Sequence, residues 1–259
     1  MQCIAITHPS GASCTIDTYG ATIVSWKIAD GTEMLYKSPL SEEGQPIRGG
    51  IPVCFPQFGT AGDFPVKHGV ARRSTHWSSS VRQSAAEFTL VLEGEDFPEQ
   101  PTLTYTVELD ANRLTLTLDV MGPIVFNGAL HTYFRAPNGI ENVSVSGLGG
   151  APATDLGGAV VLPEALKFEG PRDTIVLDAP HSLSLNTGAR IIDFGLEEGW
   201  TDVVLWNVGG DLLKDMPKGD WRGYFCAEAA LAAREHRVAL GRGETWRGVH
   251  SLEVRMMSP

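Results

Sequence analysis

The chain has 259 residues, of which 42% are hydrophobic and 20% are charged, a composition typical of an ordinary globular protein. Its formal net charge of −11 disfavours non-specific binding to nucleic acid and leaves no polybasic patch for an anionic membrane. An anionic ligand would therefore need arginines that cluster locally against the overall negative charge.

Short alternating segments separated by turn residues dominate the chain. Alternation of apolar and polar residues predicts half-buried strands over residues 21–28, 87–92, 103–109 and 113–120. The last two segments are joined by Asp-Ala-Asn, which is a strong hairpin signal. Further strands are predicted over residues 142–146, 174–177, 181–185, 202–206, 221–227 and 248–254.

Helical candidates are few and short. The best by composition is residues 228–237, although it lies between two β-like segments, which leaves a loop as the alternative. Residues 149–159 are rich in glycine and alanine, and we interpret them as a loop. No repeat and no low-complexity linker divides the chain. We therefore expect an all-β protein, a large antiparallel sandwich that forms a single domain over residues 1–259.

Targeting and redox signals are weak. The N-terminus lacks the charged and apolar regions of a signal peptide, and no apolar run approaches the roughly 18 residues of a membrane span. The cysteines are scattered without a C-x-x-C pair, which disfavours a disulfide framework or a zinc site; they are Cys3, Cys14, Cys54 and Cys226. We expect a cytoplasmic monomer with reduced thiols and with no membrane or nucleic-acid partner.

Residues 48–59 (RGGIPVCFPQFG) and 67–73 (KHGVARR) place arginines and an imidazole in one segment stiffened by glycine and proline. Such a frame is typical of a binding site. Arg48, Arg72 and Arg73 could clamp a phosphate or another oxyanion, because guanidinium groups offer paired donors to such ligands. The alternative for each is an ordinary surface arginine in a loop.

Two residues have the chemistry of proton transfer. His131 lies among apolar and aromatic neighbours, where an imidazole can shuttle protons near neutral pH; the alternative is a hydrogen-bonded core histidine. Glu228 ends an apolar strand pattern, where desolvation would raise its pKa and strengthen it as a base; a solvated turn residue is the alternative. Asp173 could accept hydrogen bonds from sugar hydroxyls or serve as a turn or cap residue.

Several cofactor patterns are missing. No G-x-G-x-x-G fingerprint opens a helix, and neither a Walker A loop nor a G-x-S-x-G elbow occurs. The histidines are too dispersed for a recognisable zinc signature. A metal site of His68, His131 and Glu228 in a cupin-like barrel is the remaining metal hypothesis, and we expect neither metal nor cofactor.

Five segments together resemble the glucose-6-phosphate 1-epimerase (hexose-6-phosphate mutarotase) family of the aldose 1-epimerase superfamily. They are residues 48–59, 68–72 (HGVAR), 130–134 (LHTYF), 204–207 (VLWN) and 226–228 (CAE). They occur in the family's order and span most of the chain. The resemblance implies a galactose-mutarotase-like antiparallel β-supersandwich with its site in a cleft on one sheet.

The resemblance also implies roles for single residues. His131 corresponds to the family's general acid and Glu228 to its general base, while the implied substrate-binding residues are Arg48, His68, Arg72 and Asp173. The chain departs from the family where Trp-Asn-Pro becomes Trp-Asn-Val, Glu-Pro-Gly becomes Glu-Ala-Ala, and Asp-Arg-Val-Tyr becomes Asp-Thr-Ile-Val. These departures leave open the loop geometry around Glu228 and the exact substrate.

The expected activity is the interconversion of α and β anomers of a hexose 6-phosphate, with D-glucose 6-phosphate as the first candidate. Acid–base opening and closure of the sugar ring would need no cofactor. The alternatives are an aldose 1-epimerase acting on free sugars and a non-catalytic sugar-phosphate-binding protein. Competition between free and phosphorylated sugars would separate a free-sugar epimerase from the expected enzyme. A non-catalytic binding protein would bind the sugar phosphate and leave the rate of anomer exchange unchanged.

Overall fold

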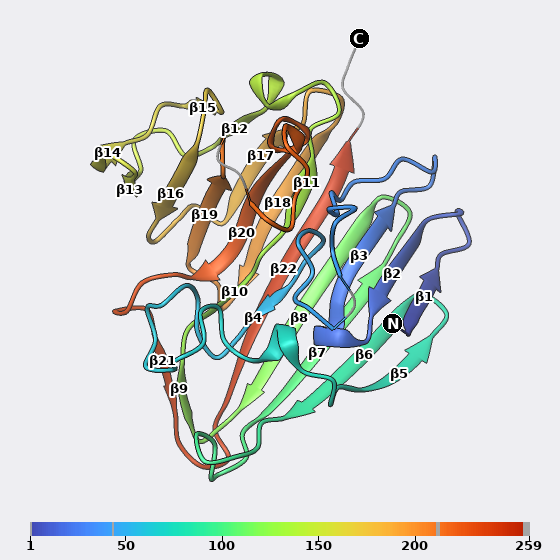
Figure 1. The fold of residues 1–259 in the computed structure, drawn as a ribbon, viewed down its shortest axis with the longest axis vertical. Helices are drawn as coiled ribbons and strands as arrows, with labels where there is room; N and C mark the ends of the chain where they lie inside the picture. The colour runs from blue at the N-terminus through green and yellow to red at the C-terminus, as the bar shows by residue number, and fades with distance from the viewer. Residues whose placement is uncertain (1, 43, 211–212, 256–259) are drawn as a thin grey trace.

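The computed structural model describes residues 2–42, 44–210 and 213–255. Its strands pair antiparallel in four sheets, and its helices are single 3-10 turns. Nine strands form the largest sheet, in the order β15-β12-β17-β18-β22-β8-β7-β6-β5 (Figure 1). Their bounds are β5 (Ser78–Arg82), β6 (Ala85–Val91), β7 (Thr102–Leu109), β8 (Arg113–Met121), β12 (Ser144–Ser146), β15 (Ala165–Lys167), β17 (Ser182–Asn186), β18 (Ile191–Glu198) and β22 (Thr245–Arg255).

The eight-stranded sheet has the order β14-β13-β16-β19-β20-β10-β4, with β11 also paired to β20. Its strands are β4 (Val53–Cys54), β10 (Gly128–Leu130), β11 (Tyr133–Arg135), β13 (Pro152–Asp155), β14 (Gly158–Val161), β16 (Arg172–Val176), β19 (Asp202–Asn207) and β20 (Tyr224–Leu231). The smaller elements are β1 (Cys3–Thr7), β2 (Ser13–Asp17), β3 (Thr22–Lys27), β9 (Ile124–Phe126), β21 (Val238–Leu240) and the 3-10 turns η1 (Tyr19–Ala21), η2 (Ala71–Arg73), η3 (Ile140–Asn142) and η4 (Asp220–Gly223).

The alternating segments form strands because one face of each can be buried. In β7 and β8 every second residue is buried and the residues between are mostly half-exposed, which matches the period of two in the sequence. The turn between them closes with the amide of Asp110 donating to the carbonyl of Arg113. This hairpin confirms the prediction made from residues 103–120.

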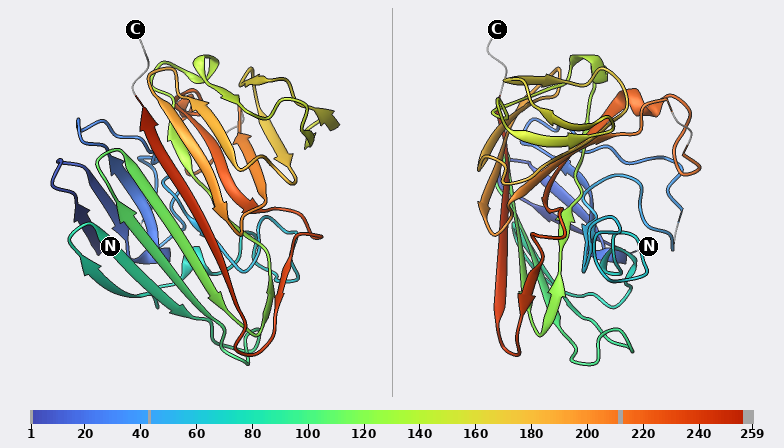
Figure 2. Two further views of the ribbon diagram at one scale, coloured as in Figure 1. Left: turned by 180° about the vertical axis from the view of Figure 1, so that it is seen from behind. Right: turned by 90° about the vertical axis from the view of Figure 1, so that its left-hand side faces the viewer.

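Buried side chains from both large sheets belong to one hydrophobic cluster. Figure 2 shows the two sheets from two further sides. Phe225, Ala227 and Ala229 of β20 join the same buried cluster as Leu252 and Val254 of β22. The two sheets therefore pack face to face, and the opposite face of β20 is free to carry a site. No helix among the described residues has the length and apolar character to cross a membrane.

Two sequence predictions were wrong. Residues 149–159, expected to be a loop, contribute β13 and the start of β14, because this hairpin extends the eight-stranded sheet beyond β16. Residues 228–237, the best helical candidate with a loop as its alternative, contain no helix: residues 228–231 end β20 and residues 232–237 form a loop. Pairing with β19 and β10 overrides the helical composition of residues 228–231.

Candidate active site

Strand β20 separates the core from the candidate site. All eight of its residues are buried, and their side chains alternate between the two faces of the sheet. One face enters the main core, whereas Glu228, with Cys226 and Ala230 on either side, lies on the other. Glu228 is 1% exposed and belongs to a cavity wall, so its carboxyl group is almost fully removed from bulk water.

His131 faces Glu228 from the chain segment between β10 and β11. Its Nδ1 atom lies 3.4 Å from Oε1 of Glu228, and the imidazole is 8% exposed. The ring stacks almost parallel on Tyr133, with centroids 4.8 Å apart and an interplanar angle of 7°. Trp206 of β19 meets the imidazole edge-on at 6.1 Å. The aromatic neighbours therefore fix the plane of the imidazole.

Burial shifts the pKa values of this pair in opposite directions. Desolvation raises the pKa of Glu228 well above its ordinary value, and the Asp173 carboxylate adds to the rise. Desolvation also lowers the pKa of His131, helped by the neighbouring His68, Arg72 and Arg48. Both shifts favour the neutral forms, a protonated Glu228 carboxyl group beside a neutral His131 imidazole.

His68 forms a second wall of the site. The amide of Gly59 donates to its Nδ1 at 3.1 Å, which makes Nδ1 an acceptor and leaves the Nε2–H free to donate. Desolvation and the nearby Arg72 and Lys67 lower the pKa of His68 to about 3, so this imidazole is a neutral donor. Its φ of +61° lies in the left-handed region, which is unusual for a residue other than glycine.

These side chains surround a cavity of about 390 Å³, a volume suited to a small ligand. Asp173 of β16 contributes a carboxylate whose pKa is raised by desolvation. Phe58, Ile175 and Trp206 supply apolar and aromatic surface, and Lys67 adds a cation. An apolar wall with a few polar groups on facing sides is the usual character of a small-molecule site.

Arg48 lies at the border of this cavity. Its guanidinium Nε and NH2 both lie 3.0 Å from Oδ2 of Asp215, and its NH1 donates to the hydroxyl of Tyr133 at 3.0 Å. The next two glycines bring the backbone close to its neighbours: a side chain on Gly50, where φ is +67°, would collide with the carbonyl oxygen of Ile23. These glycines serve internal packing and thereby set the position of Arg48.

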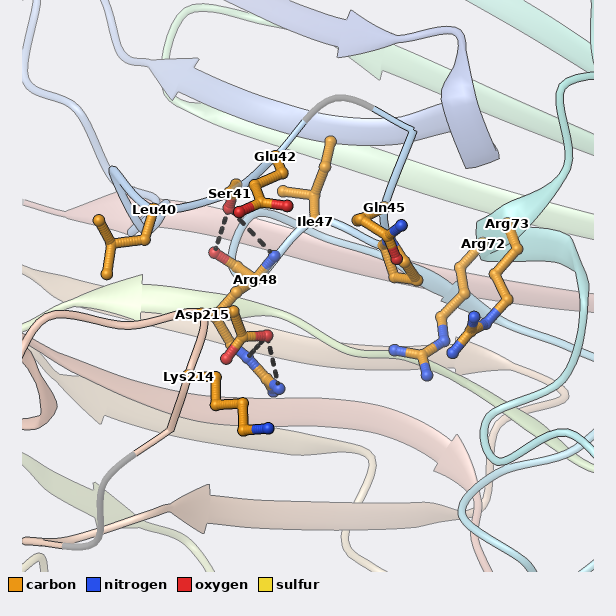
Figure 3. Close-up of a pocket in the computed structure, with 11 residues that line it drawn as sticks. Leu40, Ser41, Glu42, Gln45, Ile47, Arg48, Arg72, Arg73, Lys214 and Asp215 are labelled. Carbon is orange, nitrogen blue, oxygen red and sulfur yellow. Dashed lines mark hydrogen bonds and ion pairs between the residues drawn. The ribbon is translucent and has the colours of Figure 1, made fainter.

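A second cavity of about 430 Å³ adjoins the first and shares Arg48 (Figure 3). Arg72 and Arg73 of η2 extend into it, and Lys214 lies beside Asp215. Arg72 also donates to the carbonyl of Lys67 at 3.1 Å, which ties it to the wall of the first cavity. The lining of the second cavity includes four cationic and two acidic side chains, so this cavity is locally positive in an acidic protein.

The predicted residues thus divide between two adjoining cavities. His131, Glu228, His68 and Asp173 line the first, Arg72 lines the second, and Arg48 lines both. Sequence reasoning did not single out Lys67, Asp215 or Tyr133. Lys67 adjoins the His-Gly-Val-Ala-Arg motif and Tyr133 lies inside the His-Thr-Tyr-Phe motif, so both carried a local signal. Asp215 carried none, because it meets Arg48 only through the tertiary fold.

Within the part of the chain that the structure describes, one group of side chains has potential metal ligands. Ligand atoms of His131, Cys226 and Glu228 all lie within 4.8 Å of one another. Desolvation raises the pKa of the Cys226 thiol well above its ordinary value, which opposes formation of the thiolate that a metal needs. Arg48 and Lys67 border the same cavity and would repel a divalent cation. The residues present therefore fit a metal ion poorly.

Comparison with known proteins identifies the family. The family model for aldose 1-epimerase matches residues 2–253. The chain belongs to the aldose 1-epimerase family. This membership makes the protein an isomerase-type enzyme of mutarotase character, as the sequence motifs predicted.

Individual relatives and a solved structure support the same family and fold. An Escherichia coli (strain K12) protein named "Putative glucose-6-phosphate 1-epimerase" is 31% identical over 256 residues, covering 92% of this chain and 86% of its own. A protein of the same name from Cenchrus ciliaris is 29% identical, covering 89% of this chain and 78% of its own. The crystal structure of a Salmonella typhimurium protein described as a "putative mutarotase" superimposes with a TM-score of 0.85 at 26% identity, over 98% of this chain and 90% of its own. The predicted galactose-mutarotase-like β-supersandwich is thereby confirmed.

Proposed function

We propose that this aldose 1-epimerase family member interconverts the α and β anomers of a hexose 6-phosphate, with D-glucose 6-phosphate as the first candidate. The observation that carries the proposal is the buried His131–Glu228 pair, 3.4 Å apart in a sugar-sized cavity that shares Arg48 with a positively charged neighbour. The printed names of the E. coli and Cenchrus ciliaris relatives support the choice of substrate.

The pair can perform the reaction because it carries one transferable proton. Moving that proton from the Glu228 carboxyl to Nδ1 of His131 gives a carboxylate beside an imidazolium, with the same total number of protons. In this form Glu228 is the general base and His131, through its Nε2–H, is the general acid. The raised pKa of Glu228 makes its carboxylate a strong base, and the lowered pKa of His131 makes its imidazolium a strong acid.

The reaction then needs only proton transfers. Glu228 takes the proton of the anomeric hydroxyl while His131 gives one to the ring oxygen, and the bond between C1 and O5 breaks to leave an aldehyde. Rotation about the C1–C2 bond exposes the other face of the carbonyl. The O5 hydroxyl attacks that face, returns its proton to His131, and the oxygen on C1 recovers a proton from Glu228. The two residues end in their starting forms.

The phosphate would be recognised where the two cavities meet. Arg48 lines both, and Arg72 extends into the second, so a sugar bound at the acid–base pair could direct its 6-phosphate toward them. His68 and Asp173 would hydrogen-bond sugar hydroxyls as donor and acceptor respectively. Guanidinium groups are well suited to phosphate because they offer planar paired donors.

Exchange of the anomers of glucose 6-phosphate, followed by magnetisation-transfer NMR, tests the proposal. We expect the wild type to accelerate exchange and His131→Ala or Glu228→Gln to lose about 10²–10⁴-fold of the acceleration. His76→Ala, which removes an exposed histidine outside both cavities, is the control. Binding of the sugar phosphate without faster exchange would instead identify a sugar-binding protein.

One observation favours a second candidate, an aldose 1-epimerase for free sugars. Asp215 already occupies the Nε and NH2 of Arg48, so the guanidinium that should meet a phosphate has an internal anionic partner. The variant Arg72→Gln separates the candidates. A phosphate site predicts a larger loss with glucose 6-phosphate than with glucose, whereas equal losses would favour the free-sugar enzyme.

A further inference from the structure

The Arg48 guanidinium is connected to the catalytic imidazole by one side chain. Its NH1 donates to the hydroxyl of Tyr133 at 3.0 Å, and the ring of Tyr133 stacks on His131. The contacts form a continuous chain from Asp215 through Arg48 and Tyr133 to His131. Figure 3 shows the first contact of this chain, between Asp215 and Arg48. No other described side chain makes a hydrogen bond to the Tyr133 hydroxyl.

The Tyr133 ring has little freedom to absorb a movement at either end. It is 2% exposed, and it contacts Tyr224 and Trp206 at centroid distances of 5.5 and 6.2 Å. Its backbone is fixed because β11 pairs with β20, with Tyr133 opposite Cys226. A buried ring held on all sides can transmit a displacement, since close-packed interiors have few voids into which atoms can shift.

The Asp215 end is the adjustable one. Its side chain is 40% exposed, whereas that of Arg48 is 27% exposed, so an incoming anion can reach the ion pair from either cavity. An anion that competes with Asp215 for the guanidinium would change the direction in which NH1 is held. The hydroxyl of Tyr133 must follow that change or lose its only described hydrogen bond to a side chain.

We propose that Tyr133 is a positioning residue that couples an anion bound at Arg48 to the orientation of His131. The coupling rests on the proposed function, in which the anion is the phosphate of the substrate. The coupling would let binding energy of the remote phosphate act on the proton donor. A phosphorylated sugar would then have a higher kcat as well as a lower KM than the free sugar. By thermodynamic reciprocity, a change at His131 must alter anion binding at Arg48 by the same factor.

Two matched variants test the coupling in turnover. Tyr133→Phe keeps the stacked ring and removes only the hydroxyl. Tyr36→Phe is its control, because Tyr36 is another buried tyrosine of the same aromatic cluster whose hydroxyl donates to Asp220 at 2.9 Å. We expect Tyr133→Phe to reduce kcat for glucose 6-phosphate about tenfold more than kcat for glucose, the factor for one hydrogen bond to a charged group. Tyr36→Phe should leave that ratio unchanged.

A binding measurement that needs no turnover separates this inference from the proposed function. Inorganic phosphate is titrated into protein labelled in its histidine rings, and the imidazole resonances of His131 are followed by NMR. We expect phosphate to shift them in the wild type and in Tyr36→Phe, and to bind without shifting them in Tyr133→Phe. Phosphate binding is read independently from ³¹P line broadening.

Each other outcome has a definite meaning. Phosphate that binds the wild type without moving the His131 resonances overturns the coupling and leaves the proposed function intact. Equal shifts in the wild type and in Tyr133→Phe also overturn it, because the hydroxyl would then be dispensable. Absence of any phosphate binding removes both the phosphate site and the coupling, and directs the assignment to free sugars.

Discussion

Replacing Glu228 by glutamine should make the protein more stable, and increasingly so as the pH rises. Glutamine has nearly the same shape as glutamate and cannot ionise. Glu228 is 1% exposed, and burial raises the pKa of its carboxyl group well above the value of 4.5 expected in the unfolded chain. The native protein therefore keeps a proton that the unfolded chain releases above that pH.

The size of the effect follows from proton linkage. Between the unfolded and native pKa values of Glu228, each pH unit costs the wild type about 1.4 kcal/mol of unfolding free energy. The glutamine variant lacks this cost, so its advantage should grow by the same amount per unit. In a chain of this size, each kcal/mol of unfolding free energy corresponds to about 2–4 °C in Tm. His131 is present in both proteins, so its own titration largely cancels in the difference.

Thermal or urea unfolding of both proteins at several pH values between 5 and 8 measures this difference. Glu87→Gln is the control, because it removes an exposed carboxylate from β6 outside the site. A stability difference between Glu228→Gln and the wild type that stays constant with pH would refute the reasoning. A glutamine variant less stable than the wild type at pH 7 would show that the carboxyl group has stabilising partners in the native state.

Three further predictions concern activity and backbone packing. The rate of anomer exchange should show no step from titration of His131 near pH 6.5, because burial holds the pKa of that imidazole well below this value; a step near 6.5 that coincides with titration of the His131 ring in NMR would contradict this. Asp215→Asn should lower KM for glucose 6-phosphate about 2–10-fold without changing that for glucose, because Arg48 loses its internal anion; an equal change for both sugars would disprove competition. Gly50→Ala should lower the unfolding free energy by about 2 kcal/mol or more in denaturant titration, because its Cβ would meet a backbone oxygen at positive φ; a change below about 0.5 kcal/mol would argue against the close approach.

The strands that the sequence predicted are those with a clear local pattern. Residues 87–92, 103–109 and 113–120 alternate because one sheet face is buried and the other faces water, and they correspond to β6, β7 and β8. Strand β20 has no such alternation, since both of its faces are buried, one against the core and one against the site. The helical interpretation of residues 228–231 failed because strand pairing outweighs local propensity, whereas residues 232–237 form the loop that was the alternative.

In the candidate site, too, local sequence patterns predicted some features and missed those that depend on tertiary contacts. The sequence motifs identified His131 and Glu228 together with most of the polar residues around the cavity, although their roles remain predictions. Only the tertiary structure decided that Arg72 faces a second cavity and that Asp215 is paired with Arg48, because 167 residues separate the members of that pair.

The sequence alone determined the fold class, because burying one face of a strand imposes a period of two on the residues that form it. It also determined the family, through five motifs in a fixed order. The tertiary structure decided which charged groups meet and which are deprived of water. A pKa or an ion pair depends on every atom within several ångströms, and in this fold those atoms come from strands far apart in the chain.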